Sequence, residues 1–93
     1  MIKSTRGKLI ERILAGGTPK GFPTDLIRRA ERKLALIDAA ISLEDLRVPP
    51  SNHLEKLVGD RKGFYSIRIN RQWRLCFRWE GEDAFDVEIV DYH

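Results

Sequence analysis

The first part of the chain spaces its apolar residues as amphipathic helices do. A short helix is predicted near residues 9–14, and Gly16-Gly17 is expected to end it because glycine accepts positive φ. A longer helix is predicted over residues 24–41, with Thr24 as its N-cap. The apolar face of the short helix consists of Leu9, Ile10, Ile13 and Leu14. The apolar stripe of the longer helix consists of Leu26, Ile27, Ala30, Leu34, Ile37 and Ile41. The segment from Ser42 to Asp45 indicates a new capped turn after this helix.

From Phe64 onward the apolar period changes to two residues, which predicts β-strands with one buried face. The inward positions are Tyr65, Ile67, Ile69, Trp73, Leu75, Phe77, Trp79, Phe85, Val87 and Ile89. Ile2 and Ser4 are expected to begin a further short edge strand. We therefore predict an α+β fold in which two N-terminal helices pack on one face of a three- to four-stranded antiparallel sheet.

The shared apolar face also predicts how the strands pair, because a one-residue slip would turn every side chain over. A three-residue loop over residues 70–72 sets Ile69 opposite Trp73 and Ile67 opposite Leu75. For the next hairpin, keeping the apolar side chains together sets Trp79 opposite Phe85 and Phe77 opposite Val87. The same register sets Cys76 opposite Glu88 and Arg74 opposite Val90.

The same register brings charged side chains together on the opposite, polar face. Arg78 is expected opposite Asp86, which gives it an ordinary cross-strand partner. Arg68 is expected opposite Arg74, and like charges in that position are destabilising. Either a phosphate binds between these two arginines, or their guanidinium groups turn into solvent or reach an acid in the preceding loop, such as Asp60.

Composition limits the classes of function. A chain of 93 residues forms one domain, and no apolar run is long enough to span a membrane. The N-terminus lacks the pattern of a secretory signal and Cys76 is the only cysteine, so we expect a cytoplasmic protein. The two histidines, His53 and His93, with that cysteine are too few for a structural zinc site. We expect neither a metal nor a cofactor.

The net charge of +3 is distributed in blocks of alternating sign. Residues 1–36 and residues 61–79 each carry a net charge of +6, whereas residues 37–60 carry −3 and residues 80–93 carry −6. The two basic blocks favour a polyanionic partner such as RNA, because neutralised phosphates release counterions. They are equally compatible with a solvated basic helix and with arginines paired to the acidic tail.

The chain ends in Asp91-Tyr92-His93, directly after the last predicted strand. Metal-free RNA cleavage needs a base for the 2′-hydroxyl, an acid for the leaving oxygen and cations for the phosphate. The terminal tripeptide supplies groups that transfer protons, and Tyr92 lies on the same face as Arg74. Together these residues fit a ribonuclease site.

The strand segments 66–70, 72–77 and 87–93, preceded by Gly59-Asp60-Arg61, resemble the HigB-type toxins of the RelE superfamily, GraT-like members included. The resemblance runs from about Thr24 to His93, whereas the first 20 residues match less well. It implies a ribosome-dependent endoribonuclease that cuts mRNA in the ribosomal A site and arrests growth. It also implies a HigA-type helix-turn-helix antitoxin as partner, with contact to DNA only through that antitoxin.

The resemblance implies catalytic roles for Asp91, Tyr92 and His93, and a phosphate contact for Arg74. Further candidate contacts to RNA phosphates in the second basic block are Arg61, Lys62 and Arg68. Some members of the family place a catalytic histidine and a lysine before the Gly-Asp-Arg, where this chain has Glu55 and Val58. Either Glu55 carries the proton, or His53 reaches the site by a different loop path, or activity is weakened.

Two other functions remain open at this stage. The basic surface could bind the ribosome and block the A site without cutting RNA. A DNA-binding regulator acting through the basic helix at residues 24–41 is a weaker alternative, because no second helix after a tight turn is predicted.

Overall fold

The computed structural model describes residues 1–92, which form two α-helices and one four-stranded antiparallel sheet. The strands follow one another in the order β1-β2-β3-β4, and short 3₁₀ turns connect α2 to the sheet. The elements are α1 (Lys8–Leu14), α2 (Ile27–Ala39), β1 (Glu55–Lys56), β2 (Phe64–Arg68), β3 (Trp73–Glu80) and β4 (Asp83–Asp91). The predicted α+β class is therefore confirmed, with four strands in the sheet.

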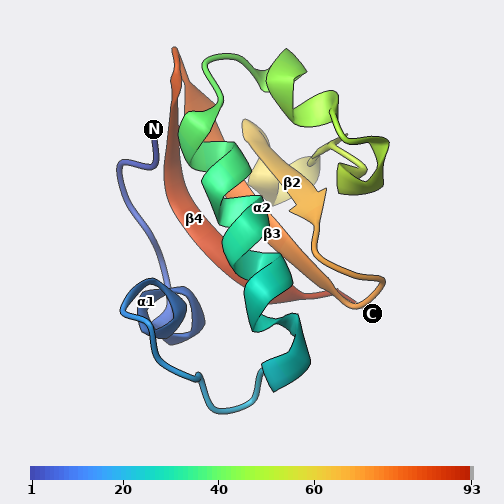
Figure 1. Ribbon diagram of the computed structural model, residues 1–93. Helices are drawn as coiled ribbons and strands as arrows, with labels where there is room; N and C mark the ends of the chain where they lie inside the picture. Colours follow the sequence, from blue (N-terminus) through green and yellow to red (C-terminus); the bar gives the residue numbers. More distant parts are fainter. Residues whose placement is uncertain (93) are drawn as a thin grey trace.

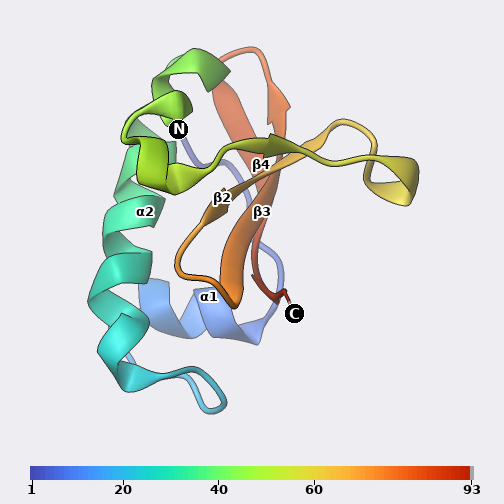
Figure 2. The same ribbon diagram turned by 90° about the vertical axis from the view of Figure 1, so that its right-hand side faces the viewer.

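Helix α2 lies across one face of the sheet (Figures 1 and 2) and buries the predicted stripe. Leu26, Ala30, Leu34 and Ile37 are all in the core, and they pack with the inward side chains of β2, β3 and β4. The ends of the helix differ from the prediction. Thr24 makes no capping hydrogen bond and begins a 3₁₀ turn instead, and because α2 ends at Ala39, Ile41 is exposed.

Helix α1 lies near the N-terminal end of α2 and contacts β4 (Figure 2). Its Ile10 and Ile13 are buried, whereas Leu14 is more than half exposed. After the helix, Gly16 has a φ of 83°, the conformation expected of the glycine pair. The segment before α1 runs parallel to β4 through two isolated bridges, Ile2 to Ala84 and Thr5 to Val87, so it covers that edge without forming a full strand.

The first predicted register is confirmed. Ile67 pairs with Leu75 and Arg68 with Arg74, and the Ile69 amide donates to the Trp73 carbonyl at 2.9 Å. The Asn70 side chain accepts from the amides of Gln72 and Trp73, which closes the three-residue loop. The two arginines are therefore fixed side by side on the face that α2 does not cover.

The second predicted register is correct only at the end near the chain terminus. Arg74 pairs with Val90 and Cys76 with Glu88, but a β-bulge follows, where Asp86 has a φ of 53°. The extra residue shifts the alternation, so that Arg78 lies opposite Phe85 and not opposite Asp86. Trp79 consequently pairs with Ala84.

This bulge moves one aromatic side chain out of the core. Phe85 is on the outer face under the Arg78 guanidinium, 4.8 Å from it, and Ala84 takes the buried position. Arg78 still reaches the Asp86 carboxylate at 3.6 Å by a diagonal contact. The assignment of Phe85 to the buried face was wrong because strict alternation leaves no room for an inserted residue.

The connection between α2 and β1 reaches the sheet face that α2 does not cover. Ser42 and Asp45 form the predicted capping box, and residues 43–47 are a 3₁₀ turn. Within residues 1–92 no α-helix follows α2, so a helix-turn-helix is absent there. The helices of the same range are too short and too polar to cross a bilayer. The loop between β1 and β2 then projects away from the helical layer (Figure 2).

Candidate active site

A cleft of about 410 Å³ lies beside the paired arginines of β2 and β3. It is lined by His53, Leu54, Glu55, Arg68, Asn70, Arg71, Arg74 and Tyr92. The β2–β3 hairpin supplies the arginines, the loop after the 3₁₀ turn at Pro50–Asn52 supplies His53, and strand β1 directly after that loop supplies Glu55. The segment after β4 supplies Tyr92. The predicted cluster is thus assembled from three separate parts of the chain.

Arg74 is held rigidly and is only 7% exposed. Its Nε donates to Ser66 Oγ at 2.8 Å, and its Nη2 donates to the His53 carbonyl at 2.6 Å and the Ser66 carbonyl at 3.3 Å. Nη2 also lies 3.0 Å from Glu55 Oε1. Among the contacts of Arg74 within residues 1–92, none uses Nη1, and Arg74 lines the cleft.

The carboxylate that reaches Arg74 belongs to Glu55 and not to Asp60. Glu55 thus helps to orient the Arg74 guanidinium group, although about half of the Glu55 side chain stays exposed. His53 has no side-chain partner among the described residues and lines the same cleft. Its backbone is left-handed, with φ 45° and ψ 56°, which a residue other than glycine rarely adopts.

Arg68 lacks the partners that Arg74 has. In residues 1–92 it forms no hydrogen bond or ion pair, and it lines both the first cleft and a second groove of about 810 Å³. The second groove lies between α2 and the β2–β3 turn, and it shares His53, Asn70 and Arg71 with the first. Among the described residues, Glu55 is the only acid that lines either of them, and the cations that line them are Arg29, Arg32, Lys33, Arg68, Arg71 and Arg74. Such a surface attracts polyanions.

The C-terminal residues are placed differently from one another. The Tyr92 ring lies under the Arg74 guanidinium, 5.7 Å from it, and lines the cleft. Asp91 pairs with Trp73 across the sheet, accepts from Gln72 Nε2 at 3.2 Å, and is not among the residues lining the cleft. His93 lies outside the described residues. The structure thus brings together Tyr92 and Arg74 but not Asp91.

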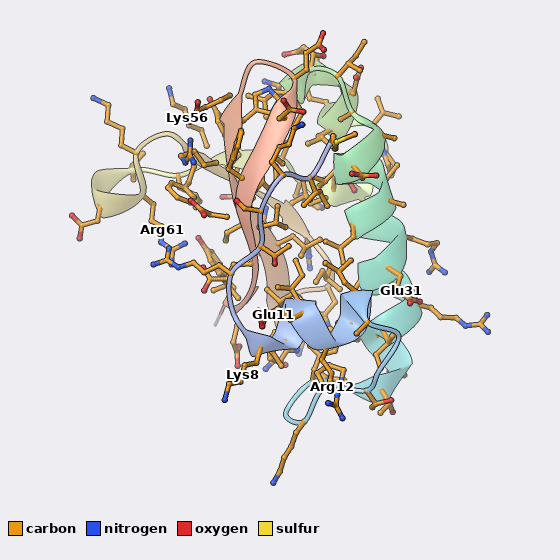
Figure 3. The ribbon with its side chains drawn as sticks, turned by 90° about the vertical axis from the view of Figure 1, so that its left-hand side faces the viewer. Lys8, Glu11, Arg12, Glu31, Lys56 and Arg61 are labelled. Carbon is orange, nitrogen blue, oxygen red and sulfur yellow. The ribbon has the colours of Figure 1, made fainter. Side chains whose placement is uncertain are left out.

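Arg61 and Lys62, the remaining candidate contacts to RNA, belong to the β1–β2 loop and do not line the cleft. Arg61 lines a smaller pocket with Glu55 and Tyr92, and its Nη1 is 3.5 Å from Glu88 Oε1. Figure 3 shows Arg61 on the projecting loop and Lys56 close to it, both away from α2. Lys62 is exposed and lines none of these pockets.

Cys76 is buried beneath the pocket that Arg61 lines. Desolvation by burial raises the pKa of its thiol above the ordinary value. A buried thiol that resists ionisation is a poor nucleophile. In residues 1–92 no group of three or more His, Cys, Asp or Glu side chains is arranged to hold a metal ion.

The sequence analysis did not predict the burial of two polar residues near the cleft, Lys33 and Asn52. Lys33 is 9% exposed and its Nζ donates to Asn52 Oδ1 at 2.5 Å. Lys33 follows Ala30 by three residues and precedes Ile37 by four, so the helical period places it on the buried face. That spacing was a usable signal for Lys33, whereas nothing in the sequence indicated that Asn52 would be buried.

Comparison with known proteins identifies the family. The model of the RelE-like toxins of type II toxin-antitoxin systems, HigB, matches residues 3–93. This chain belongs to the HigB toxin family. The match extends almost to the N-terminus, beyond the boundary near Thr24 at which the sequence resemblance was placed.

Two named proteins are similar in sequence to this toxin. It is 32% identical to the endoribonuclease HigB of Proteus vulgaris over 93 residues, which cover both chains completely. Toxin HigB-1 of Vibrio cholerae is 47% identical over 58 residues, or 62% of this chain and 61% of that protein. The aligned part thus spans less than two thirds of the Vibrio protein.

Solved structures of RelE-like toxins share the fold of this HigB toxin. A variant of YafQ from E. coli superposes with a TM-score of 0.68 at 15% identity, covering 98% of this chain and 91% of that one. The structure of the YoeB dimer from Staphylococcus aureus gives a TM-score of 0.60 at 20% identity over 99% and 94% of the two chains. At these identities the comparison supports the α+β architecture alone.

Proposed function

We propose that this toxin is a ribosome-dependent endoribonuclease that cuts mRNA in the ribosomal A site and so arrests translation and growth. The observation that carries the proposal is the cleft in which Arg68, Arg74 and Tyr92 converge with His53. The name of the Proteus vulgaris relative, endoribonuclease HigB, supports the same activity.

The proposed roles follow from the contacts of each side chain. Arg68 and Nη1 of Arg74 bind the scissile phosphate, because arginine supplies fixed charge that does not titrate. Tyr92 and His93 exchange protons with the reacting oxygens, while Glu55 orients Arg74. Of the two loop candidates, His53 is the proton carrier, since Glu55 is already paired.

The remaining predicted residues have supporting roles in this proposal. Asp91 fixes the end of β4 through Gln72 and so positions Tyr92, which follows it. Arg61 and Lys62 contact RNA phosphates beyond the cleft, on the side of the β1–β2 loop. The reaction needs no metal and no cofactor.

Membership of a type II toxin-antitoxin family implies an antitoxin partner. We propose that this antitoxin is a HigA-type helix-turn-helix protein, that the complex contacts DNA only through it, and that the toxin acts in the cytoplasm on the ribosome and its mRNA. A neighbouring reading frame of about a hundred residues with a helix-turn-helix pattern, whose product co-purifies with this chain, would support the partner. Isolation of the toxin without such a product from cells expressing both genes would contradict it.

Primer extension on mRNA from arrested cells tests the reaction itself. Cleavage predicts new 5′ ends inside codons of translated messages, and none on the same RNA incubated with toxin but without ribosomes. Occlusion of the A site without cutting predicts growth arrest with no new 5′ ends. Val58 favours this alternative, because it is an exposed apolar residue at the position where the family resemblance implies a lysine in some members.

Arg68→Ala is expected to weaken RNA binding and to make it less dependent on salt. Loss of one phosphate contact lowers the slope of log affinity against log salt by about 0.7 for single-stranded RNA. Fluorescence anisotropy with a labelled single-stranded RNA at several salt concentrations measures this slope. Arg47→Ala is the matched control, because Arg47 is exposed and pairs with Glu44 away from the cleft. Equal slopes for Arg68→Ala and wild type would remove Arg68 from the binding site.

A further inference from the structure

The loop that carries His53 is attached to the helical layer by a buried lysine. Lys33 Nζ donates to Asn52 Oδ1 at 2.5 Å, and no acid in residues 1–92 pairs with it. Lys33 lies on the same face of α2 as Leu34 and Ile37, which are core residues. A lysine in such a place is costly, because burial disfavours its charged form. Its pKa is accordingly lowered, first by desolvation and then by the nearby Arg29 and Arg32.

The Asn52 side chain connects Lys33 to the backbone of the loop. It is completely buried, and its Nδ2 donates to the carbonyl of Leu46 at 3.1 Å and to that of Val48 at 3.3 Å. One amide side chain therefore links α2 to two points of the preceding loop. The Asn52 backbone amide also donates to the Pro49 carbonyl, which fixes the start of the turn.

His53 follows Asn52 directly and is held from its other side by Arg74. The His53 amide donates to the Pro50 carbonyl at 3.0 Å, and its carbonyl accepts from Arg74 Nη2 at 2.6 Å. Its left-handed backbone, with φ 45°, needs such support because the conformation is unfavourable for a side chain with a Cβ. With both ends anchored, His53 lines both the cleft and the second groove.

We propose that Lys33 is a positioning residue that acts through Asn52 to hold His53 in its left-handed conformation and so direct the imidazole into the cleft. The inference rests on the role given to His53 in the proposed function. Lys33 itself does not touch the reacting atoms. The alternative, in which Lys33 contributes to RNA binding as one more cation of the second groove, makes a different prediction.

Single-turnover cleavage on programmed ribosomes separates these roles through four forms of the full chain: wild type, Lys33→Met, His53→Ala and the double variant. Misplacing a catalytic group costs on the order of 10²-fold in rate, so Lys33→Met is expected to approach that loss. The double variant is expected to cleave no more slowly than His53→Ala, because both changes remove one and the same contribution. Arg28→Met removes the same charge from an exposed position of α2 and is expected to cleave like wild type.

Each other outcome overturns the inference in a distinguishable way. If Lys33→Met slows cleavage by the same factor with and without His53, Lys33 does not act through that residue. If Lys33→Met weakens ribosome binding but leaves the single-turnover rate unchanged, it is an RNA contact. If His53→Ala cleaves like wild type, the role proposed for His53 is itself wrong.

A structural readout keeps the test independent of activity. The chain has only two histidines, so the imidazole signals of His53 are assigned in NMR spectra by comparison with His93→Gln. Lys33→Met and Asn52→Ala are both expected to shift the His53 signals, whereas Arg28→Met is not. Unshifted His53 signals in folded Lys33→Met and Asn52→Ala would overturn the proposal.

Discussion

Arg74→Ala is expected to lower the rate of mRNA cleavage on the ribosome by about 10²- to 10³-fold, the usual cost of losing one group that stabilises transition-state charge. Two effects combine in this variant. The variant no longer offers Nη1 to the phosphate in the proposed binding mode, and the His53 carbonyl and the Glu55 carboxylate lose the donor that holds them. Single-turnover cleavage on programmed ribosomes measures the loss.

Arg74→Lys sharpens this prediction. Lysine keeps the charge, but its single ammonium cannot make the separate contacts of Nε and Nη2 to Ser66, His53 and Glu55. We therefore expect it to lose nearly as much activity as alanine. Arg78→Ala is the matched control, since Arg78 is on the same strand but pairs with Asp86 outside the cleft. Full activity of Arg74→Lys would show that charge alone suffices.

The part of the fold that the sequence predicts well depends on local rules that nothing in the structure interrupts. The β2–β3 register follows from alternation and a three-residue loop, and Asn70 completes that loop with its own side chain. The β3–β4 hairpin obeys the same rules as far as Cys76 and Glu88. Beyond them the bulge at Asp86 changes the parity, and the aromatic Phe85 gave no sign of this because Arg78 stabilises it on the outer face.

The candidate site was predictable where its residues share a strand register and unpredictable where it depends on long-range contacts. Register alone placed Arg68 beside Arg74. It did not reveal that Arg74 binds the His53 carbonyl, because that contact joins residues 21 positions apart through a loop without a periodic pattern. For the same reason neither the choice between His53 and Glu55 nor the burial of Asn52 could be read from the sequence.

The contacts of Arg74 also link the proposed binding of phosphate to the position of the loop that carries His53. The same guanidinium group that faces the cleft accounts for the position of His53 on one side and lies over Tyr92 on the other. Phosphate bound at Nη1 would therefore meet groups that are already oriented, which reduces the reorganisation needed during the reaction. Substitution of Arg74 would therefore disturb both the proposed phosphate contact and the position of His53, whereas removal of the Tyr92 hydroxyl would leave the Arg74 contacts in place.

Tyr92→Phe is expected to lower cleavage by about 10²- to 10⁴-fold, the range for loss of a group that transfers a proton. Phenylalanine keeps the ring beneath the Arg74 guanidinium and removes only the hydroxyl, so binding to the ribosome should change little. His93→Gln is expected to show a loss in the same range. Single-turnover cleavage and ribosome co-sedimentation measure the two properties separately, and Tyr65→Phe is the control for a tyrosine outside the cleft.

Growth arrest must follow cleavage in these variants if the toxin acts as an enzyme. Because neither Tyr92→Phe nor His93→Gln replaces an arginine or lysine that lines the two grooves, a protein that merely occupied the A site is expected to stay toxic after either change. Growth curves and primer extension on the same cultures therefore decide between the two mechanisms. Loss of new 5′ ends together with loss of arrest supports the ribonuclease, whereas arrest without new 5′ ends would mean that the surface blocks the ribosome.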